Sequence, residues 1–205
     1  MTKNSLNYKN KWLKPHIEMN INKGLTFYVT LAENKSEWAS VDGFVKMDID
    51  LEINECYIRE IVLETQNQGQ NYGFAMFKVL FEMLYQYYKD NAIEFQDIKV
   101  KGGIEKLYMM NNDTKSKQIY ESIKWFYEAL GFEFKDEKNY EKHFDTLEYL
   151  KLYNTNLAQY IELRDAKVDL AIQEQLLHDY EEEVQRFKSN MIGRLIIQIL
   201  RKSNK

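Results

Sequence analysis

The sequence predicts a mixed α/β domain over residues 1–140, followed by an all-helical extension over residues 141–205. Three observations support this division. Short segments rich in β-branched and aromatic residues recur in the first 64 residues, as is typical of strands. An amphipathic segment with helical spacing follows at residues 74–90. Between Gly131 and Gly193 there is neither glycine nor proline, which favours helix over most of that region.

Three strands are expected between residues 25 and 64. "LTFYVTL" (25–31) is short, β-branched and aromatic. "FVKMDIDLEI" (44–53) alternates between apolar and polar residues, a period typical of a half-buried strand. Its predicted buried face comprises Val45, Met47, Ile49, Leu51 and Ile53. "CYIREIVLE" (56–64) is the third strand, residues 53–55 are the expected turn, and the short links indicate an antiparallel meander.

A polar loop, two helices and a short strand are expected next. After the loop at 65–73, the helical stripe of segment 74–90 consists of apolar residues 74, 77, 80, 81, 84, 85 and 88. "DIKVKG" (97–102) is a short strand. The amphipathic stretch 118–130 runs into Gly131, where a left-handed helix cap is expected, and Phe132 begins the last strands of the sheet.

The extension carries two apolar rows with three-and-four spacing. The first comprises Leu150, Tyr153, Leu157, Tyr160 and Ile161, and the second comprises Leu177, Tyr180, Val184, Phe187 and Met191. The phase slips around "RDAKVDL" (164–170), which predicts either two helices or one long bent helix. Such rows favour burial between subunits, so a homodimer through these helices is expected. A helical pair folded back on the sheet is the alternative. The basic, apolar end "MIGRLIIQILRKSNK" (191–205) also fits a membrane surface or nucleic acid.

Composition excludes several classes of protein. The net charge of −4 argues against a polyanion-binding protein, so a nucleic-acid partner is not expected. Cys56 is the only cysteine, which excludes an internal disulfide and fits an inert buried thiol in a reducing compartment. His16, His143 and His178 lack metal-ligand spacing, so no metal is expected. The sequence shows no signal peptide and no transmembrane segment, and a cytoplasmic location is expected.

The segment Gln70-Asn71-Tyr72-Gly73-Phe74-Ala75 follows a strand and opens a helix. The first amides of a helix lack intrahelical partners, and the helix dipole adds partial positive charge there. A glycine at this point lets the backbone approach a phosphate closely. The loop has neither the Lys-Ser/Thr of a nucleotide hydrolase nor the G-x-G-x-x-G of a dinucleotide-binding fold. It is therefore either an anion cradle of another kind or a plain strand-to-helix connection.

Two motifs in order resemble those of the GCN5-related N-acetyltransferase (GNAT) superfamily. Gln70-x-x-Gly73-x-Ala75 is similar to the superfamily's acyl-coenzyme A loop, with its pattern Gln/Arg-x-x-Gly-x-Gly/Ala. About fifty residues later, "FYEALGFEF" (126–134) resembles its second signature, a tyrosine four residues before Gly-Phe. The resemblance covers residues 55–135.

The resemblance implies a GNAT-like twisted mixed sheet flanked by helices, which splays open after its fourth strand to hold acetyl-CoA as co-substrate. It implies that the pyrophosphate lies on the amides of Gln70, Asn71, Tyr72, Gly73, Phe74 and Ala75, and that the pantetheine bonds the strand edge near Leu63. It places Tyr127 as the general acid that protonates the leaving thiolate, a role that a phenol can fill. Tyr127 as a core or interface tyrosine is the alternative.

A general base is less clearly indicated. Glu60 is the nearest match to a glutamate that some superfamily members place on this strand. Glu60 and Glu64 share one strand face, expected to point away from Arg59 and Ile61. Simple solvent exposure of Glu60 is the alternative.

Two functions are therefore expected. The first is an N-acyltransferase that moves an acetyl group from acetyl-CoA to an amine of a small molecule or protein. The second is a non-catalytic binding or adaptor protein on the same fold, acting through its helical arm. The second reading depends on two departures from the superfamily pattern. The loop lacks a basic residue, and only about 24 residues precede the first expected strand, too few for the usual strand and two helices.

Overall fold

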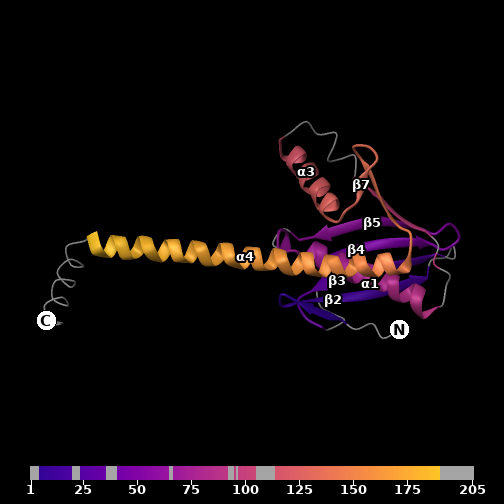
Figure 1. Ribbon diagram of the computed structural model, residues 1–205, viewed down its shortest axis with the longest axis horizontal. Coiled ribbons are helices and arrows are strands. Elements are labelled where there is room, and N and C mark those ends of the chain that lie inside the picture. The colour runs from indigo at the N-terminus through magenta and orange to yellow at the C-terminus, as the bar shows by residue number, and fades with distance from the viewer. Residues whose placement is uncertain are drawn as a thin grey trace. The chain divides into compact units, whose positions relative to one another are not determined.

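A computed structural model describes residues 5–19, 24–35, 41–64, 67–91, 95, 97–104 and 114–189 (Figure 1). Its strands are β1 (Leu6–Tyr8), β2 (Lys11–Met19), β3 (Leu25–Ala32), β4 (Val41–Asp50), β5 (Glu55–Leu63), β6 (Ile98–Gly103), β7 (Glu133–Phe134) and β8 (Asn139–Phe144). Its helices are α1 (Tyr72–Asp90), α3 (Thr114–Ala129) and α4 (Leu147–Ser189).

The described strands form one mixed sheet in the order β1-β2-β3-β4-β5-β6-β8-β7. Strands β1 to β5 pair antiparallel in chain order, which confirms the meander expected for β3, β4 and β5. Strand β6 joins β5 in parallel, and β8 and β7 complete the sheet antiparallel. With helices beside the sheet and a long carboxy-terminal helix, the predicted α/β class is confirmed.

Two strands precede the one that was expected to be first. Strands β1 and β2 form a hairpin whose turn residues Lys9 and Asn10 have φ values of 48° and 64°. Two successive positive φ values are the geometry of a type I′ turn, whose twist matches that of paired strands. Pro15 prevented the prediction of β2 from the sequence, because proline has no backbone N–H to donate to the neighbouring strand. It is tolerated because β1 has ended by this point and pairs only with Lys11–Leu13.

Strand β4 is shifted toward the amino terminus relative to the expected 44–53. Val45, Met47 and Ile49 are buried as predicted, whereas Leu51 and Ile53 lie in the turn before β5, where Ile53 is exposed. The Asp50 carboxylate accepts the Glu52 N–H at 3.0 Å, and Asn54 has a φ of 52°. Turn chemistry therefore ends the strand although the apolar alternation continues.

The core lies between the sheet and α1, which crosses strands β2, β3 and β4 (Figure 1). The buried side chains of the sheet include Phe27, Val29, Val45, Met47, Cys56 and Ile58, and those of the helix include Phe77, Leu80, Phe81, Leu84 and Tyr88. Cys56 is a fully buried free thiol, as expected, and burial raises its pKa. The other sheet face is polar and carries Tyr28, Lys46, Asp48 and Glu60 in neighbouring register positions.

Helix α4 is a single continuous helix, so the phase slip at 164–170 is not a break. Its first turns pack on the domain through buried Leu150, Leu157 and Ile161. Asn154 Nδ2 donates to Glu82 Oε2 of α1 at 2.7 Å. The compact units are residues 1–161 and 162–205, whereas the boundary expected at 140/141 falls inside β8.

Among the described helices, none is long and apolar enough to cross a membrane. The basic, apolar end at 191–205 lies outside the described residues.

Candidate functional site

The sheet opens between its only described pair of parallel strands. Strand β5 pairs with β6 at Glu55↔Lys99, Cys56↔Val100 and Tyr57↔Lys101, and β5 then continues to Leu63 beyond the last of these pairs. Beyond Tyr57, β5 is therefore no longer paired with β6, which leaves a wedge-shaped opening between the two strands. A wedge of this kind gives an extended ligand access to strand N–H and C=O groups.

A β-bulge lies at the apex of the wedge. The register between β4 and β5 passes from Met47↔Ile58 to Lys46↔Glu60, which leaves Arg59 as the extra residue. A bulge bends its strand and increases the local twist, so it turns β5 away from β6 at the point where their pairing ends. Arg59 was expected to lie on the opposite strand face from Glu60, and the bulge makes that expectation wrong. Arg59 donates from Nε to Asp48 Oδ2 at 2.6 Å, on the same polar face as Glu60.

The end of β5 leads through a tight loop into α1. Gly69 and Asn71 adopt positive φ values of 79° and 64°, which reverse the chain in few residues. The first helical hydrogen bond runs from the Ala75 N–H to the Asn71 carbonyl at 3.0 Å, so the amides of residues 72–74 precede the helical ladder. The first turn of α1 contains no acidic residue. An anion is thus favoured here by both the amides and the helix dipole.

Gly73 is needed for close packing at this loop. A Cβ built on Gly73 would lie 3.0 Å from the Phe126 ring of α3 and 3.6 Å from Leu63 Cδ1. The glycine therefore brings together the loop, the end of β5 and α3. These are three of the parts that the sequence motifs indicated separately.

The side chains of Tyr72 and Phe74 make contacts within the fold. The Tyr72 hydroxyl donates to the Lys9 carbonyl at 3.0 Å and thereby holds the β1–β2 turn against the first residue of α1. The Phe74 ring packs on Phe126 with centroids 4.8 Å apart. Gln70 is exposed, and the Gln68 amide donates to the Leu63 carbonyl at 3.2 Å.

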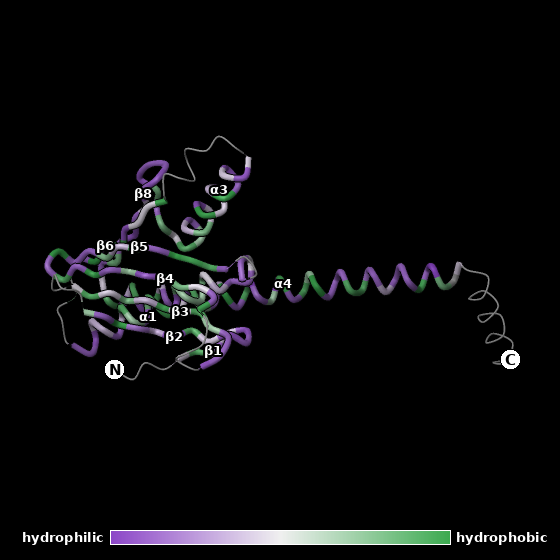
Figure 2. Tube along the Cα trace, turned by 180° about the vertical axis from the view of Figure 1, so that it is seen from behind, coloured by the Kyte–Doolittle hydropathy of each residue, from purple (hydrophilic) through white to green (hydrophobic). Residues whose placement is uncertain are grey.

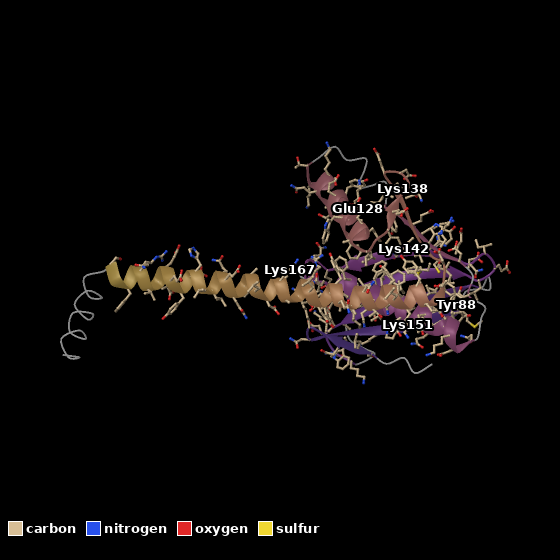
Figure 3. The ribbon with its side chains drawn as sticks, viewed as in Figure 1. Tyr88, Glu128, Lys138, Lys142, Lys151 and Lys167 are labelled. Carbon is tan, nitrogen blue, oxygen red and sulfur yellow. The ribbon has the colours of Figure 1, made fainter. Side chains whose placement is uncertain are left out.

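Helix α3 ends in the cap that the sequence predicted. Gly131 has a φ of 72°, its N–H donates to the Glu128 carbonyl at 2.8 Å, and the Phe132 N–H donates to the Tyr127 carbonyl at 3.0 Å. This pair of bonds is a Schellman motif, and the edge-to-face contact of Tyr127 with Phe132 is its accompanying apolar contact. Lys142 Nζ donates to the Gly131 carbonyl at 3.0 Å, a favourable place for a cation at a helix end (Figure 3).

Tyr127 is buried beneath α3 and stacks on Tyr140 of β8, with ring centroids 3.9 Å apart. Burial raises the pKa of Tyr127 to about 12, and a hydrogen bond with Tyr140 opposes that shift. Burial also raises the pKa of Tyr140 well above its usual value. Both phenols are therefore protonated at neutral pH, the form that a general acid requires.

Strand order, wedge, bulge, loop and capped helix form one arrangement, in which the parallel pair β5–β6 opens just before the glycine-bearing start of α1. The chain has a GNAT-like fold.

Solved structures of acetyltransferases and toxins are among the structural neighbours of this chain. The KacTA–DNA complex matches with 15% sequence identity and a TM-score of 0.39, covering 63% of this chain and 74% of that one. A tyrosine mutant of the AtaT toxin, bound to the carboxy terminus of its antitoxin AtaR and to acetyl-CoA, matches with 13% identity and a TM-score of 0.36, covering 62% and 71%. A putative GNAT-family acetyltransferase from Desulfovibrio desulfuricans matches with 10% identity and a TM-score of 0.35, covering 58% and 68%. No family model and no curated protein matches the chain. Likenesses this distant say nothing about activity.

The apex of the wedge between β5 and β6 borders a cavity of about 660 Å³. It is lined by Tyr57, Ile58, Arg59, Lys101, Gly102, Gly103, Ile104, Lys135, Lys138, Asn139, Tyr140 and Glu141. Tyr140 is a lining residue that the sequence motifs did not indicate. A Cβ built on Gly102 would lie 2.3 Å from the Tyr140 hydroxyl, so this phenol lies directly over the β6 backbone. The Gly102-Gly103 pair in a strand is the sequence signal that something approaches closely.

Glu60 and Tyr127 are not brought together on one face. Glu60 is exposed on β5, opposite Lys46 on the polar sheet face, whereas Tyr127 packs against Phe77 on the α1 side.

The residues present fit the shape of an acyl-CoA co-substrate. The amides of residues 72–74 precede the helical ladder of α1, and β5 beyond Tyr57 offers a strand edge. Within the described residues, no group of three or more His, Cys, Asp or Glu is placed to hold a metal ion.

Proposed function

We propose that this chain is an N-acyltransferase that transfers an acetyl group from acetyl-CoA to an amine. The observation that carries the proposal is the coincidence of the β5–β6 wedge with the loop at Gly69–Ala75 and with Gly73 in contact range of Leu63 and Phe126. The free part of the β5 edge and the loop lie at the same end of β5, and Tyr127 is proposed to serve the same site from α3.

The residues have distinct proposed roles. The backbone of residues 70–75 holds the pyrophosphate, the main chain near Leu63 aligns the pantetheine, and Tyr127 holds a proton for the leaving sulfur. In the reaction the amine nitrogen bonds to the acyl carbon, the carbon–sulfur bond breaks, the sulfur gains a proton from Tyr127, and the nitrogen loses one to Glu60 directly or through water. The acceptor is proposed to approach from the polar sheet face, where Glu60 is exposed.

Calorimetric titration of the full chain with acetyl-CoA and with CoA tests the proposal. We expect micromolar binding of both and release of free thiol when a panel of amines and lysine peptides is added. Val168→Lys, at an exposed position of α4 in the unit 162–205, is a control that should leave cofactor affinity unchanged. Absence of binding at millimolar acetyl-CoA would overturn the enzyme proposal.

A non-catalytic adaptor is the second candidate. It is favoured by the loop, which contributes no basic residue to a pyrophosphate, and by the exposed apolar side chains of α4. An adaptor would fail the titration above and still bind a partner protein through residues 162–189.

The net charge of −4 remains the ground for expecting no nucleic-acid partner. One neighbour, KacTA, was solved with DNA. A titration of the chain with duplex DNA at physiological salt checks the expectation, and salt-dependent binding would contradict it.

A further inference from the structure

Helix α4 exposes a second apolar row after it leaves the core. Up to Ile161 the row of Leu150, Leu157 and Ile161 is buried against the domain, although Leu152 on another side of the helix is exposed. Leu163, Leu170 and Leu177 are each more than half exposed. Leu163 follows Leu157 by six residues, which at about 100° per residue places it about 120° away around the helix. The phase slip in the sequence is therefore a change of face, and the second face is not covered by the described residues of its own unit. Figure 2 shows apolar residues recurring along this part of α4 among hydrophilic ones.

The second face has heptad spacing. Position a is occupied by Leu163, Leu170, Leu177 and Val184. Position d is occupied by Ala166, Gln173, Tyr180 and Phe187. Four successive apolar a positions, with d positions that are apolar except for one glutamine, fit the seam of a coiled coil. We infer that residues 163–187 pair with the same residues of a second copy of this chain, as a parallel, in-register coiled coil.

Gln173 specifies the register. In a parallel in-register pair each d residue meets its own copy, so the two Gln173 amides can hydrogen-bond to each other. In an antiparallel pair, or after a shift of register, each glutamine would face an apolar residue and lose that partner.

The flanking charges favour the same orientation. In the parallel pair, position g of one helix meets position e of the next heptad in the other, so Glu162 meets Lys167 of the second copy. The contact of Asp169 with Glu174 is unfavourable. An antiparallel pair sets g against g, and the charged g residues of the described helix, Glu162, Asp169 and Glu183, are all acidic.

The seam is tested by light scattering of the full chain with matched variants. We expect a dimer, and a monomer after Leu170→Asp/Leu177→Asp. Val168→Asp/Ile172→Asp is the control, because these side chains are similarly exposed and apolar but lie outside the seam. A monomeric wild-type chain, a trimer or larger assembly, or equal disruption by the control pair would overturn the proposal. Circular dichroism of each variant shows that the domain remains folded.

Disulfide trapping tests the orientation. Ala166→Cys places two thiols side by side in the parallel dimer, within the roughly 7 Å Cα separation that a disulfide spans. In an antiparallel dimer with Ala166 opposite Val184, the two thiols would be about 27 Å apart. We expect nearly complete cross-linking under mild oxidation, without interference from buried Cys56. A dimer that persists without cross-linking would overturn the parallel assignment.

A charge test is independent of oxidation. Glu162→Lys should weaken the dimer several-fold, and Glu162→Lys/Lys167→Glu should restore it.

Discussion

The rings of Tyr127 and Tyr140 stack with their centroids 3.9 Å apart and their planes at 24°. One comes from the last turn of α3 and the other from β8, and the cap at Gly131 together with the β6–β8 ladder fixes them face to face. Tyr140 lines the cavity beside the wedge, whereas Tyr127 lies behind it. The stacking therefore places the candidate acid next to a side chain that lines the cavity.

Tyr127→Phe removes the proposed acid and preserves ring packing. We expect turnover to fall by roughly 10²-fold or more, as for a general acid, with acetyl-CoA affinity unchanged. Tyr88→Phe is the control, because Tyr88 is equally buried but lies near the carboxy-terminal end of α1 (Figure 3). Unchanged turnover in Tyr127→Phe would remove the general-acid assignment.

Tyr140→Phe separates two roles for the cavity phenol. If Tyr140 only orients Tyr127, we expect a smaller loss of turnover than in Tyr127→Phe. A larger loss than in Tyr127→Phe would show that Tyr140 is the residue that donates the proton. Steady-state kinetics of both variants, with the same amine, decide between these outcomes.

The raised pKa of Tyr127 predicts loss of stability at alkaline pH. Its pKa is raised from 10.0 to about 12, so folding favours the protonated phenol. This contribution is complete below pH 10 and is lost as pH rises from 10 to 12, up to about 3 kcal/mol of unfolding free energy. Urea denaturation at pH 9, 10 and 11 measures it. The decline should be shallower in Tyr127→Phe, and an identical pH dependence in both proteins would contradict the prediction.

Gly73→Ala tests the close packing at the loop. The new methyl group would meet the Phe126 ring at 3.0 Å, so we expect a destabilisation of about 1–2 kcal/mol and weaker acetyl-CoA binding. Adding Phe126→Leu should recover much of the stability. Gly103→Ala is the control, because its Cβ would have no atom nearer than 3.4 Å. Thermal denaturation and calorimetry read out both effects, and a fully stable Gly73→Ala protein would show that the contact is not needed.

A largely buried ion pair ties the amino-terminal hairpin to the sheet. Lys11 Nζ lies 2.6 Å from Asp42 Oδ2, and their side chains are 16% and 6% exposed. We expect Lys11→Met alone to cost about 3 kcal/mol, because it leaves the buried Asp42 carboxylate without its cation. Asp42→Asn should cost less, because Glu33 Oε1 lies 3.8 Å from Lys11 Nζ. The double variant Lys11→Met/Asp42→Leu should cost less than the sum of the single changes. Arg186→Gln, which breaks an exposed pair with Glu182, should have no measurable effect on unfolding by urea.

Local patterns in the sequence were sufficient for most elements of the domain. β-branched and aromatic composition predicted β3, a period of two predicted β4, the short apolar segment 56–64 predicted β5, and the helical stripe predicted α1 to within two residues of its observed start at Tyr72. Gly131 marked the α3 cap, because a left-handed residue after a helix is usually glycine. These features depend on neighbours only a few residues away, so the sequence displays them directly.

The sequence by itself determined the α/β class, the loop at Gln70–Ala75 and the position of Tyr127 near the end of α3. Only the tertiary structure decided that Pro15 lies in a strand, that Arg59 is the bulge residue at the wedge, and that Tyr140 crosses Gly102 to stack on Tyr127. It also decided that α4 is one helix whose apolar row changes face after Ile161. These facts depend on register and packing between segments far apart in the chain, and strand pairing brings such segments together without a local signature.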